Sequence, residues 1–154
     1  MQRREKPKGA GNPKARRRTV MAFGTFDILH PGHVSYLKQA AELGDELVVV
    51  IATDANVEKI KGRPPVYSQE QRRGLVESLR IVDRAIVGVE DDMIRSVERI
   101  RPEVVALGYD QQPGNEVLER KLHERGINAR IMRLKAFQPE IYKSSKIKER
   151  IRMA

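Results

Sequence analysis

Residues 20–33 read Val-Met-Ala-Phe-Gly-Thr-Phe-Asp-Ile-Leu-His-Pro-Gly-His, and they are the most informative stretch of the chain. The four apolar residues before Gly24 are typical of a buried strand. Pro31 suits the first turn of a helix, where its missing N–H group costs nothing. The stretch therefore predicts a buried strand, a short loop and a helix that begins beside His30 and His33.

Short apolar runs and helical patterns continue to alternate along the chain. Strands are predicted at 46–53, 84–88, 104–108 and 129–134, and helices at 33–43, 68–79, 93–101, 115–125 and from about Ser144. Helix-length crossovers favour parallel strands, so this order predicts an α/β fold, a single domain with a five-stranded parallel sheet and helices on both faces. Ligands of such sheets bind at the carboxyl ends of the strands, so functional residues are expected just after Phe23, Thr53 and Leu107.

The positive charge of the chain is concentrated at its N-terminus. The 154 residues carry a net charge of +9, and residues 1–18 account for +7 of it with eight basic residues and one acidic residue. This segment has too little apolar surface to fold alone, so we expect a disordered basic tail at 1–18 and one folded domain at 19–154. An RNA- or nucleotide-binding module that uses the tail is the non-enzyme alternative. The rest of the chain is nearly neutral, so the tail is expected to be a solvated extension, and no nucleic-acid partner is expected.

Several classes of protein are not expected from the composition. The chain has no cysteine, which excludes disulfides, thiolate catalysis and cysteine-ligated zinc, and which favours a reducing cytoplasm. No apolar run approaches the roughly 18 residues that a membrane span needs. No leader with a cleavage site is recognised, so neither a membrane partner nor secretion is expected.

His30 and His33 lie three residues apart, on one face of the predicted helix N-terminus. Backbone N–H groups and the helix dipole favour an anion at that position. With Gly32 allowing close approach, the pair predicts a site for a phosphate chain. The remaining histidine, His123, falls on a distant predicted helix, so no metal site made of protein ligands is expected.

The run from Gly24 to Asp27, followed by His30-Pro31-Gly32-His33, resembles the H-x-G-H signature of the cytidylyltransferase-like nucleotidyltransferases. The resemblance extends from about Val20 to Ile151. It implies a Rossmann-like domain in which a phosphate-bearing acceptor attacks the α-phosphorus of a nucleoside triphosphate, and pyrophosphate leaves. An ionised phosphate nucleophile needs no general base, so positioning and charge stabilisation would carry catalysis.

The resemblance implies roles for residues of several segments. The expected catalytic residues are His30, His33, Lys61 and Arg80. The expected nucleotide-binding residues are Thr25, Phe26, His30, Pro31, Gly32, His33, Arg72, Asp110, Phe137, Ser144 and Ser145. A divalent cation, expected to be Mg²⁺, would be bound mainly through the nucleotide phosphates.

Ordinary structural explanations stay open for several of these residues. Lys61 falls in a predicted lysine-rich surface loop, 59–63, that follows the second strand. Arg72 could be a solvated helix charge, and Arg80 could be the partner of a helix C-terminus. Asp110 could be a turn residue, and either serine could cap the last helix.

The segment before the last helix bears on the substrate. Glycerol-3-phosphate cytidylyltransferases carry Arg-Thr-Glu-Gly-Ile-Ser-Thr-Thr there, whereas residues 138–145 read Gln-Pro-Glu-Ile-Tyr-Lys-Ser-Ser, which argues against CTP. Residues 61–64, 70–73 and 107–111 are similar to those of archaeal FAD synthases, and Phe137 falls where those enzymes place an aromatic residue. This resemblance implies that ATP and FMN are substrates and that a homodimer is an option. Cytidylyl transfer from CTP to glycerol 3-phosphate or a similar phospho-alcohol is the alternative.

Overall fold

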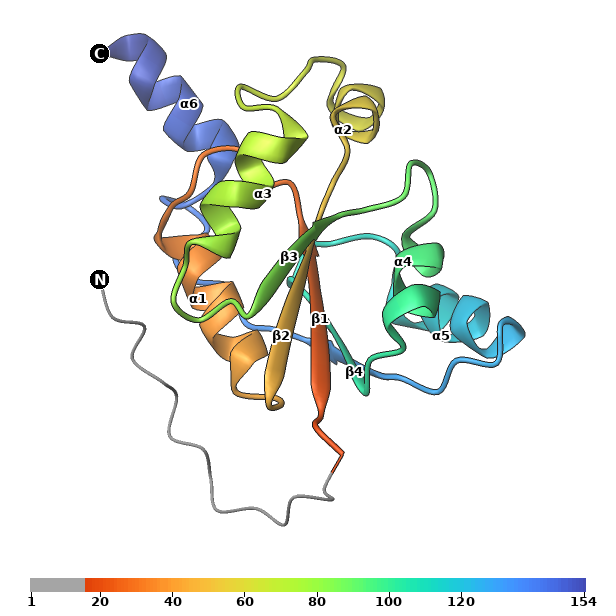
Figure 1. The fold of residues 1–154 in the computed structure, drawn as a ribbon. Coiled ribbons are helices and arrows are strands. Elements are labelled where there is room, and N and C mark those ends of the chain that lie inside the picture. Colours follow the sequence, from red (N-terminus) through yellow and green to blue (C-terminus); the bar gives the residue numbers. More distant parts are fainter. Residues whose placement is uncertain (1–15) are drawn as a thin grey trace.

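The computed structural model describes residues 16–154, and its centre is a five-stranded sheet with the strand order β3-β2-β1-β4-β5 (Figure 1). The strands are β1 Thr19–Gly24, β2 Glu46–Ile51, β3 Arg84–Val87, β4 Val104–Leu107 and β5 Arg130–Arg133. Every neighbouring pair is parallel. The α/β fold and the five-stranded parallel sheet that the sequence predicts are therefore confirmed.

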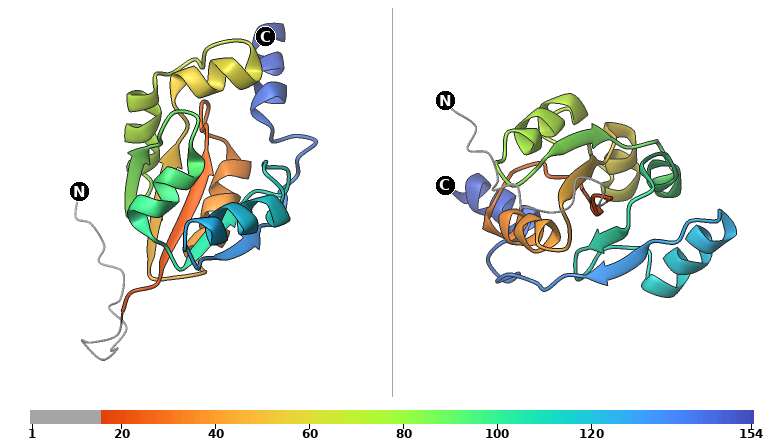
Figure 2. Two further views of the ribbon diagram at one scale, coloured as in Figure 1. Left: turned by 90° about the vertical axis from the view of Figure 1, so that its right-hand side faces the viewer. Right: turned by 60° about the horizontal axis from the view of Figure 1, so that its bottom comes forward.

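Helices cover both faces of the sheet, as predicted. The helices are α1 Pro31–Ala41, α2 Asp54–Lys61, α3 Gln69–Glu77, α4 Met93–Ile100, α5 Asn115–Glu124 and α6 Ser144–Met153. Helices α1 and α3 pack on one face, and α4 and α5 pack on the other (Figure 1). Figure 2 shows α2 and α6 beyond the carboxyl ends of the strands, where they flank the loops that leave the sheet.

The alternation of side chains along β1 builds two separate cores. Val20 and Ala22 belong to the hydrophobic cluster under α1 and α3, whereas Met21 and Phe23 belong to the cluster under α4 and α5. Residues of a strand point alternately to the two faces, so a strand covered on both faces is apolar throughout. Residues 47–51 of β2 are likewise all buried.

The structure contains one helix that the sequence analysis does not predict. Thr53 begins α2 by accepting a hydrogen bond from the Asn56 N–H group at 3.1 Å, and Gly62 ends it with a φ of 73°. The prediction that Lys59 and Lys61 lie in a loop is therefore wrong, because both lie in the last turn of α2. Helical N- and C-caps outweigh the polar composition that suggested a loop.

Residues 1–15 of the predicted basic tail lie outside the described residues. Its last residues contact the domain: Arg16 Nε lies 3.0 Å from Glu103, and the Arg18 N–H group donates to Asp45 at 2.8 Å. Within residues 16–154, the structure has no helix that is long and apolar enough to cross a membrane.

Candidate active site

The loops after β1, β2 and β4 leave the carboxyl edge of the sheet, and α6 begins beside them (Figure 2). The chain passes from β1 to its neighbour β2 on one side and returns through β3 to β4 on the other. The point where such an order reverses is where open α/β sheets bind ligands. We name the side chains that gather there the histidine site, which comprises His30, His33, Lys61, Lys148 and Ser144.

His30 and His33 are held together at the start of α1, as the sequence predicts. His30 is the N-cap, and its Nδ1 atom accepts a hydrogen bond from the Gly32 N–H group at 3.1 Å. The two imidazole rings stack with their centroids 3.7 Å apart. Because Nδ1 accepts, a neutral His30 carries its proton on Nε2, which lies 3.5 Å from the Ser144 hydroxyl. A donor is thereby directed toward the start of α6.

His33 lies deeper and is poised to remain neutral. Burial, with smaller effects of the charges on His30 and Lys61, lowers the pKa of His33 to about 3. Burial also lowers the pKa of His30. Among residues 16–154, the Nδ1 atom of His33 is buried with no hydrogen-bond partner. Leaving a buried polar atom unpaired is costly, so His33 is held at this position at some expense of stability.

Two glycines make room for the rings around the histidines. A Cβ atom on Gly24 would lie 2.6 Å from the ring of Phe26, which is 2% exposed and packs edge-on against His33 with a centroid distance of 5.1 Å. A Cβ atom on Gly32 would lie 2.9 Å from the ring of His30 and 3.1 Å from the carbonyl oxygen of Tyr142. The groups that approach Gly32 closely are therefore parts of the protein, namely the His30 ring and the Tyr142 carbonyl oxygen.

Asp27, in the loop after β1, is joined to residues 66–67 and to α6 by hydrogen bonds. Its carboxylate is 2% exposed and accepts hydrogen bonds from the Val66 N–H group at 2.9 Å, the Tyr67 N–H group at 3.0 Å and Lys148 Nζ at 2.6 Å. Burial alone would raise the pKa of Asp27. The hydrogen bonds from Lys148, Tyr67 and Val66 and the charge of Lys148 outweigh burial and hold this pKa below its usual 3.8.

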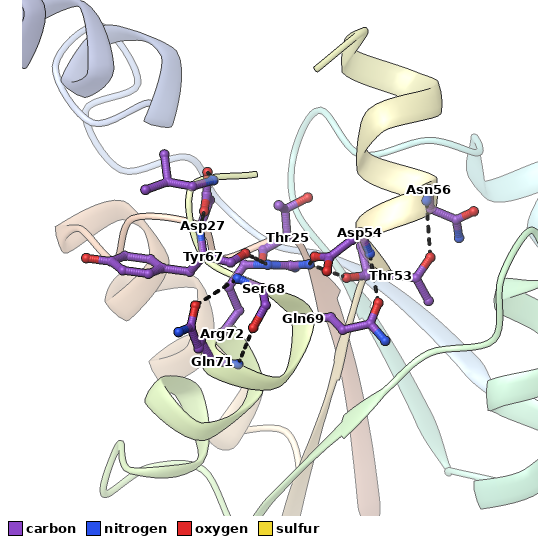
Figure 3. Close-up of polar contacts among 12 residues, drawn as sticks. Thr25, Asp27, Thr53, Asp54, Asn56, Tyr67, Ser68, Gln69, Gln71 and Arg72 are labelled. Carbon is purple, nitrogen blue, oxygen red and sulfur yellow. Dashed lines mark hydrogen bonds and ion pairs between the residues drawn. The ribbon is translucent and has the colours of Figure 1, made fainter. Parts of the chain in front are cut away.

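Arg72 is a buried connector of the surrounding loops (Figure 3). Its guanidinium donates to the carbonyl oxygens of Tyr67 at 2.9 Å, Thr25 at 2.8 Å and Ala52 at 2.8 Å, and to the Asp54 carboxylate at 2.8 Å. The Arg72 side chain is 0% exposed. This geometry favours a role in holding the loops after β1 and β2 over the direct nucleotide contact that the sequence analysis predicts.

Lys61 adds positive charge beside the histidines. Burial lowers the pKa of Lys61, and the charge of Lys148 lowers it further, against the opposite effect of Asp27. The charge of Lys61 in turn lowers the pKa of His33. The structure therefore brings Lys61 to the histidine site from the end of α2, and the two lysines make this part of the molecule attractive to an anion.

The segment before α6 lies against the loop after β4. Lys143 Nζ is 3.4 Å from the Asp110 carboxylate and 5.7 Å from the centre of the Tyr109 ring. Phe137 stacks on Tyr142 with a centroid distance of 5.8 Å, and Phe137 remains 41% exposed. Asp110 is thus engaged by a lysine, and part of the Phe137 ring is free to meet a ligand.

The start of α6 completes the histidine site. Lys143 occupies the N-cap position, and within the described residues no side chain caps this end. The capping by a serine that the sequence analysis left open therefore does not occur. Ser144 faces His30, and Ser145 is exposed. The uncapped N–H groups of α6 are available to a phosphate or a carbonyl group.

Of the predicted site residues Pro31 and Arg80, the first lies beside the histidine pair and the second does not. Pro31 is the exposed first residue of α1, next to the histidine pair. Arg80 is exposed and follows α3, three residues before Asp83, whose carboxylate accepts from the Leu47 N–H group near the start of β2. The start of β2 lies at the amino edge of the sheet, so the structure does not bring Arg80 to the histidine site.

Two residues that organise this edge, Lys148 and Arg133, are not among the predicted site residues. Lys148 lies one helical turn after Ser144, a spacing that places both on one face of α6. Arg133, at the end of β5, donates to the carbonyl oxygens of Gly108, Gln111 and Pro113 at 2.6–2.9 Å. A charged residue at the end of a predicted strand was the available signal for Arg133.

Comparisons with known proteins agree with this geometry. A family model described as cytidylyltransferase-like matches residues 21–150. The FAD synthase of Picrophilus torridus is 45% identical over 132 residues, which cover 86% of this chain and 94% of that protein. The FAD synthase of Ferroglobus placidus is 49% identical over 134 residues, which cover 86% of each.

Two solved structures share the fold. A protein from Thermoplasma volcanium, described as a lipopolysaccharide core biosynthesis protein, superimposes with a TM-score of 0.76 at 41% identity and covers 80% of this chain and 100% of its own. A pantoate-beta-alanine ligase from Francisella tularensis has a TM-score of 0.60 at 14% identity, covers 89% of this chain and 70% of its own, and shows likeness of fold alone.

Proposed function

The chain belongs to the cytidylyltransferase-like family, and from this premise we infer that it is an FAD synthase, a nucleotidyltransferase that transfers AMP from ATP to the phosphate of FMN. One observation carries the reaction type, which is the stacked pair of His30 and His33 beside the uncapped start of α6. The identity of 45–49% to proteins named FAD synthase supports ATP and FMN as the substrates.

The chemistry needs positioned donors rather than a base. An oxygen of the FMN phosphate attacks the α-phosphorus of ATP, the bond from that phosphorus to the bridging oxygen breaks, and pyrophosphate leaves with the electron pair. No proton has to be removed from an ionised phosphate. His30 Nε2, His33 and Lys61 would donate to phosphate oxygens as negative charge builds on the leaving group. The N–H groups at the start of α6 would hold another phosphate oxygen.

A divalent cation, which we propose is Mg²⁺, would be bound mainly through the phosphates of ATP. Proteins commonly hold Mg²⁺ with one or two carboxylates plus substrate phosphates rather than in an all-protein cage. Among residues 16–154, no group of three or more His, Asp or Glu side chains could hold a metal ion. Its chemistry would be to neutralise charge on the phosphates.

The segment before α6 supports a role in nucleotide selection. Phe137 presents a partly exposed ring, and Gln138 follows it with a φ of 42°. We propose that the base of ATP stacks on Phe137, with Asp110 and Ser145 near the nucleotide. Substituting Phe137 by Ala should raise the KM for ATP more than the KM for FMN.

A pyrophosphate-release screen tests the proposed function. ATP and CTP are each incubated with the protein and with FMN, glycerol 3-phosphate or phosphopantetheine, in the presence of Mg²⁺. Turnover confined to ATP with FMN is the expected result. Turnover confined to CTP would contradict it and favour the cytidylyltransferase alternative, and no turnover with any pair would count against both.

The variant His33→Ala separates an enzyme from a binding module. It should lower kcat by about 10²–10³-fold, the usual loss when one donor to a developing charge is removed. A module that binds RNA through its basic tail would instead show strong, salt-dependent affinity that is lost on removal of residues 1–18 and unaffected by His33→Ala.

The compartment and the assembly are further proposals. A cytoplasmic location fits a chain without cysteine, since a reducing compartment does not support disulfides. A homodimer is proposed from the resemblance to other nucleotidyltransferases. Sedimentation equilibrium of the full chain would give its mass in solution, and a monomer at micromolar concentration would contradict the dimer.

A further inference from the structure

Strands β1 and β4 separate before they reach the carboxyl edge of the sheet. On its other side, β1 remains paired with β2 as far as Gly24, opposite Ile51. Its pairing with β4 ends earlier, at Ala22 opposite Ala106. The backbone of Phe23 therefore has no partner strand on the side of β4, at the point where the order of the sheet reverses and where ligands of such sheets bind.

Two side chains take the place of the missing strand pairing. The Tyr36 hydroxyl, from α1, accepts from the Phe23 N–H group at 3.1 Å and donates to the Ala106 carbonyl oxygen at 2.8 Å. Gln111 Nε2 donates to the Phe23 carbonyl oxygen at 2.7 Å, and Gln111 Oε1 accepts from the Gly108 N–H group at 2.8 Å. We name these two side chains the Tyr36–Gln111 bridge.

The Tyr36 side of the bridge reaches the histidines. Tyr36 lies three residues after His33, about one helical turn along α1. Its ring stacks with the ring of Phe26 at a centroid distance of 6.4 Å, and Phe26 packs edge-on against His33. A change in the position of Tyr36 would therefore move α1 and the ring on which His33 rests.

The Gln111 side of the bridge reaches the loop after β4. Gln111 follows Asp110, and its own carbonyl oxygen accepts from Arg133 at 2.6 Å. Arg133 also donates to the Gly108 carbonyl oxygen at 2.8 Å. The loop is thus fixed from both ends, to β5 by Arg133 and to β1 by the side chain of Gln111.

We propose that Tyr36 and Gln111 are positioning residues for nucleotidyl transfer, because they hold the histidine-bearing helix and the loop after β4 at a fixed separation across the gap between β1 and β4. This inference rests on the proposed function. Displacement of a reacting group by about 1 Å can cost about 10²-fold in rate, so a bridge made of four short hydrogen bonds is suited to this role.

The experiment compares Gln111→Met with a matched control. Methionine has nearly the length of glutamine but neither its donor nor its acceptor. Gln112→Met makes the same change at the exposed neighbouring position. For each protein, kcat and the KM values for ATP and FMN are measured with Mg²⁺ at a temperature where circular dichroism shows it fully folded. We expect Gln111→Met to lower kcat by about 10–100-fold, with smaller changes in either KM, and Gln112→Met to match the wild type.

A purely structural bridge would give a different result. It would lower the melting temperature of Gln111→Met and leave kcat of the folded protein within twofold of the wild type, and this outcome would overturn the proposal. Tyr36→Phe, which keeps the ring and removes the hydroxyl, should also lower kcat. In the double variant the losses should be less than multiplicative, because both side chains serve the same junction.

Two further measurements keep the test decisive. If Tyr36→Phe does not fold, Gln111→Glu is used as the second variant. A glutamate at this position keeps the oxygen that accepts from the Gly108 N–H group and loses the amide that donates to the Phe23 carbonyl oxygen. Amide hydrogen exchange of Gly108 should accelerate in Gln111→Met without any substrate, and an unchanged rate would also overturn the proposal. A wild-type protein inactive on ATP and FMN would refute the proposed function, whereas an active wild type with equally active variants would refute the bridge alone.

Discussion

The ammonium group of Lys148 lies 2.6 Å from the carboxylate of Asp27, and this buried contact joins α6 to the loop after β1. The two residues are 121 positions apart in the chain. The Lys148 side chain is 14% exposed and the Asp27 side chain 2% exposed. No residue of α6 is fully buried, so this ion pair makes an important contribution to holding α6, and with it Ser144, beside His30.

Breaking this pair should destabilise the protein. Removing one partner of a buried ion pair costs about 3–5 kcal/mol. Asp27 keeps two backbone N–H donors when Lys148 is lost, so we expect Lys148→Met to lower the free energy of unfolding by a smaller amount, about 2 kcal/mol. Lys146→Met, at an exposed position of the same helix, is the control. Urea denaturation followed by circular dichroism measures both, and equal midpoints for the two variants would contradict the expectation.

The contribution of this pair should depend on pH. The pKa of Asp27 is lower in the folded protein than its usual 3.8, so ionised Asp27 stabilises the fold above that pH, and the stabilisation is lost as the pH falls through the folded-state pKa. The difference in unfolding free energy between wild type and Asp27→Asn should therefore be constant from pH 5 to 7 and shrink below about pH 4. Urea titrations at several pH values test this, and a difference that grows on acidification would have the wrong sign.

The histidines should act as neutral groups in the free enzyme. The pKa of His33 is about 3, and burial also holds the pKa of His30 below its usual 6.5. The pH dependence of kcat/KM reports the ionisations of the free enzyme. It should therefore show no ionisation of His33 near pH 6.5, and the wild type and His33→Gln should have pH profiles of the same shape there. A step in the wild type that His33→Gln lacks would mean that His33 is protonated when ATP binds.

Local sequence patterns were sufficient to predict most of the fold. The apolar run before Gly24 became β1, and Pro31 began α1. The helix predicted from residue 68 became α3, whose start is fixed by a capping box of Ser68 and Gln71. These features depend on residues within one or two turns of one another, so their physical causes are present in the sequence itself.

The parts of the site that could not be predicted depend on long-range pairing. An arginine that is solvated on a helix and an arginine that is buried between loops look alike in sequence. Arg72 is buried, because the carbonyl groups of Thr25 and Ala52 come together around its guanidinium only in the folded chain. The pairing of Asp27 with Lys148 likewise has no local signal. Helix α2 was missed because its cap at Thr53 was not recognised beside a lysine-rich segment.

The neighbouring arginines of α3 should differ sharply when substituted. Arg72→Ala removes a fully buried side chain and leaves three part-buried carbonyl acceptors without their donor. A buried unpaired acceptor costs about 1–3 kcal/mol, so the variant should lose about 3 kcal/mol of stability. Arg73 pairs with Glu70 and Glu77 at the surface, and Arg73→Ala should shift the urea midpoint little. A mild effect of Arg72→Ala on stability together with a large rise in the KM for ATP would instead support direct contact with the nucleotide.

Two glycines in helices should respond in opposite ways to a single added methyl group. In Gly32→Ala the new Cβ would lie 2.9 Å from the ring of His30 and 3.1 Å from the Tyr142 carbonyl oxygen, so the ring has to move away from its position beside Ser144. We expect kcat to fall by about tenfold or more, because the donor is displaced from the phosphate. Gly74 lies in α3, where a methyl group would meet no side chain or other segment within 4 Å, and alanine there should stabilise the fold by about 0.5–1 kcal/mol with kcat unchanged. Steady-state kinetics and urea denaturation of both variants check this contrast. Full activity in Gly32→Ala would show that the position of His30 is not critical for catalysis.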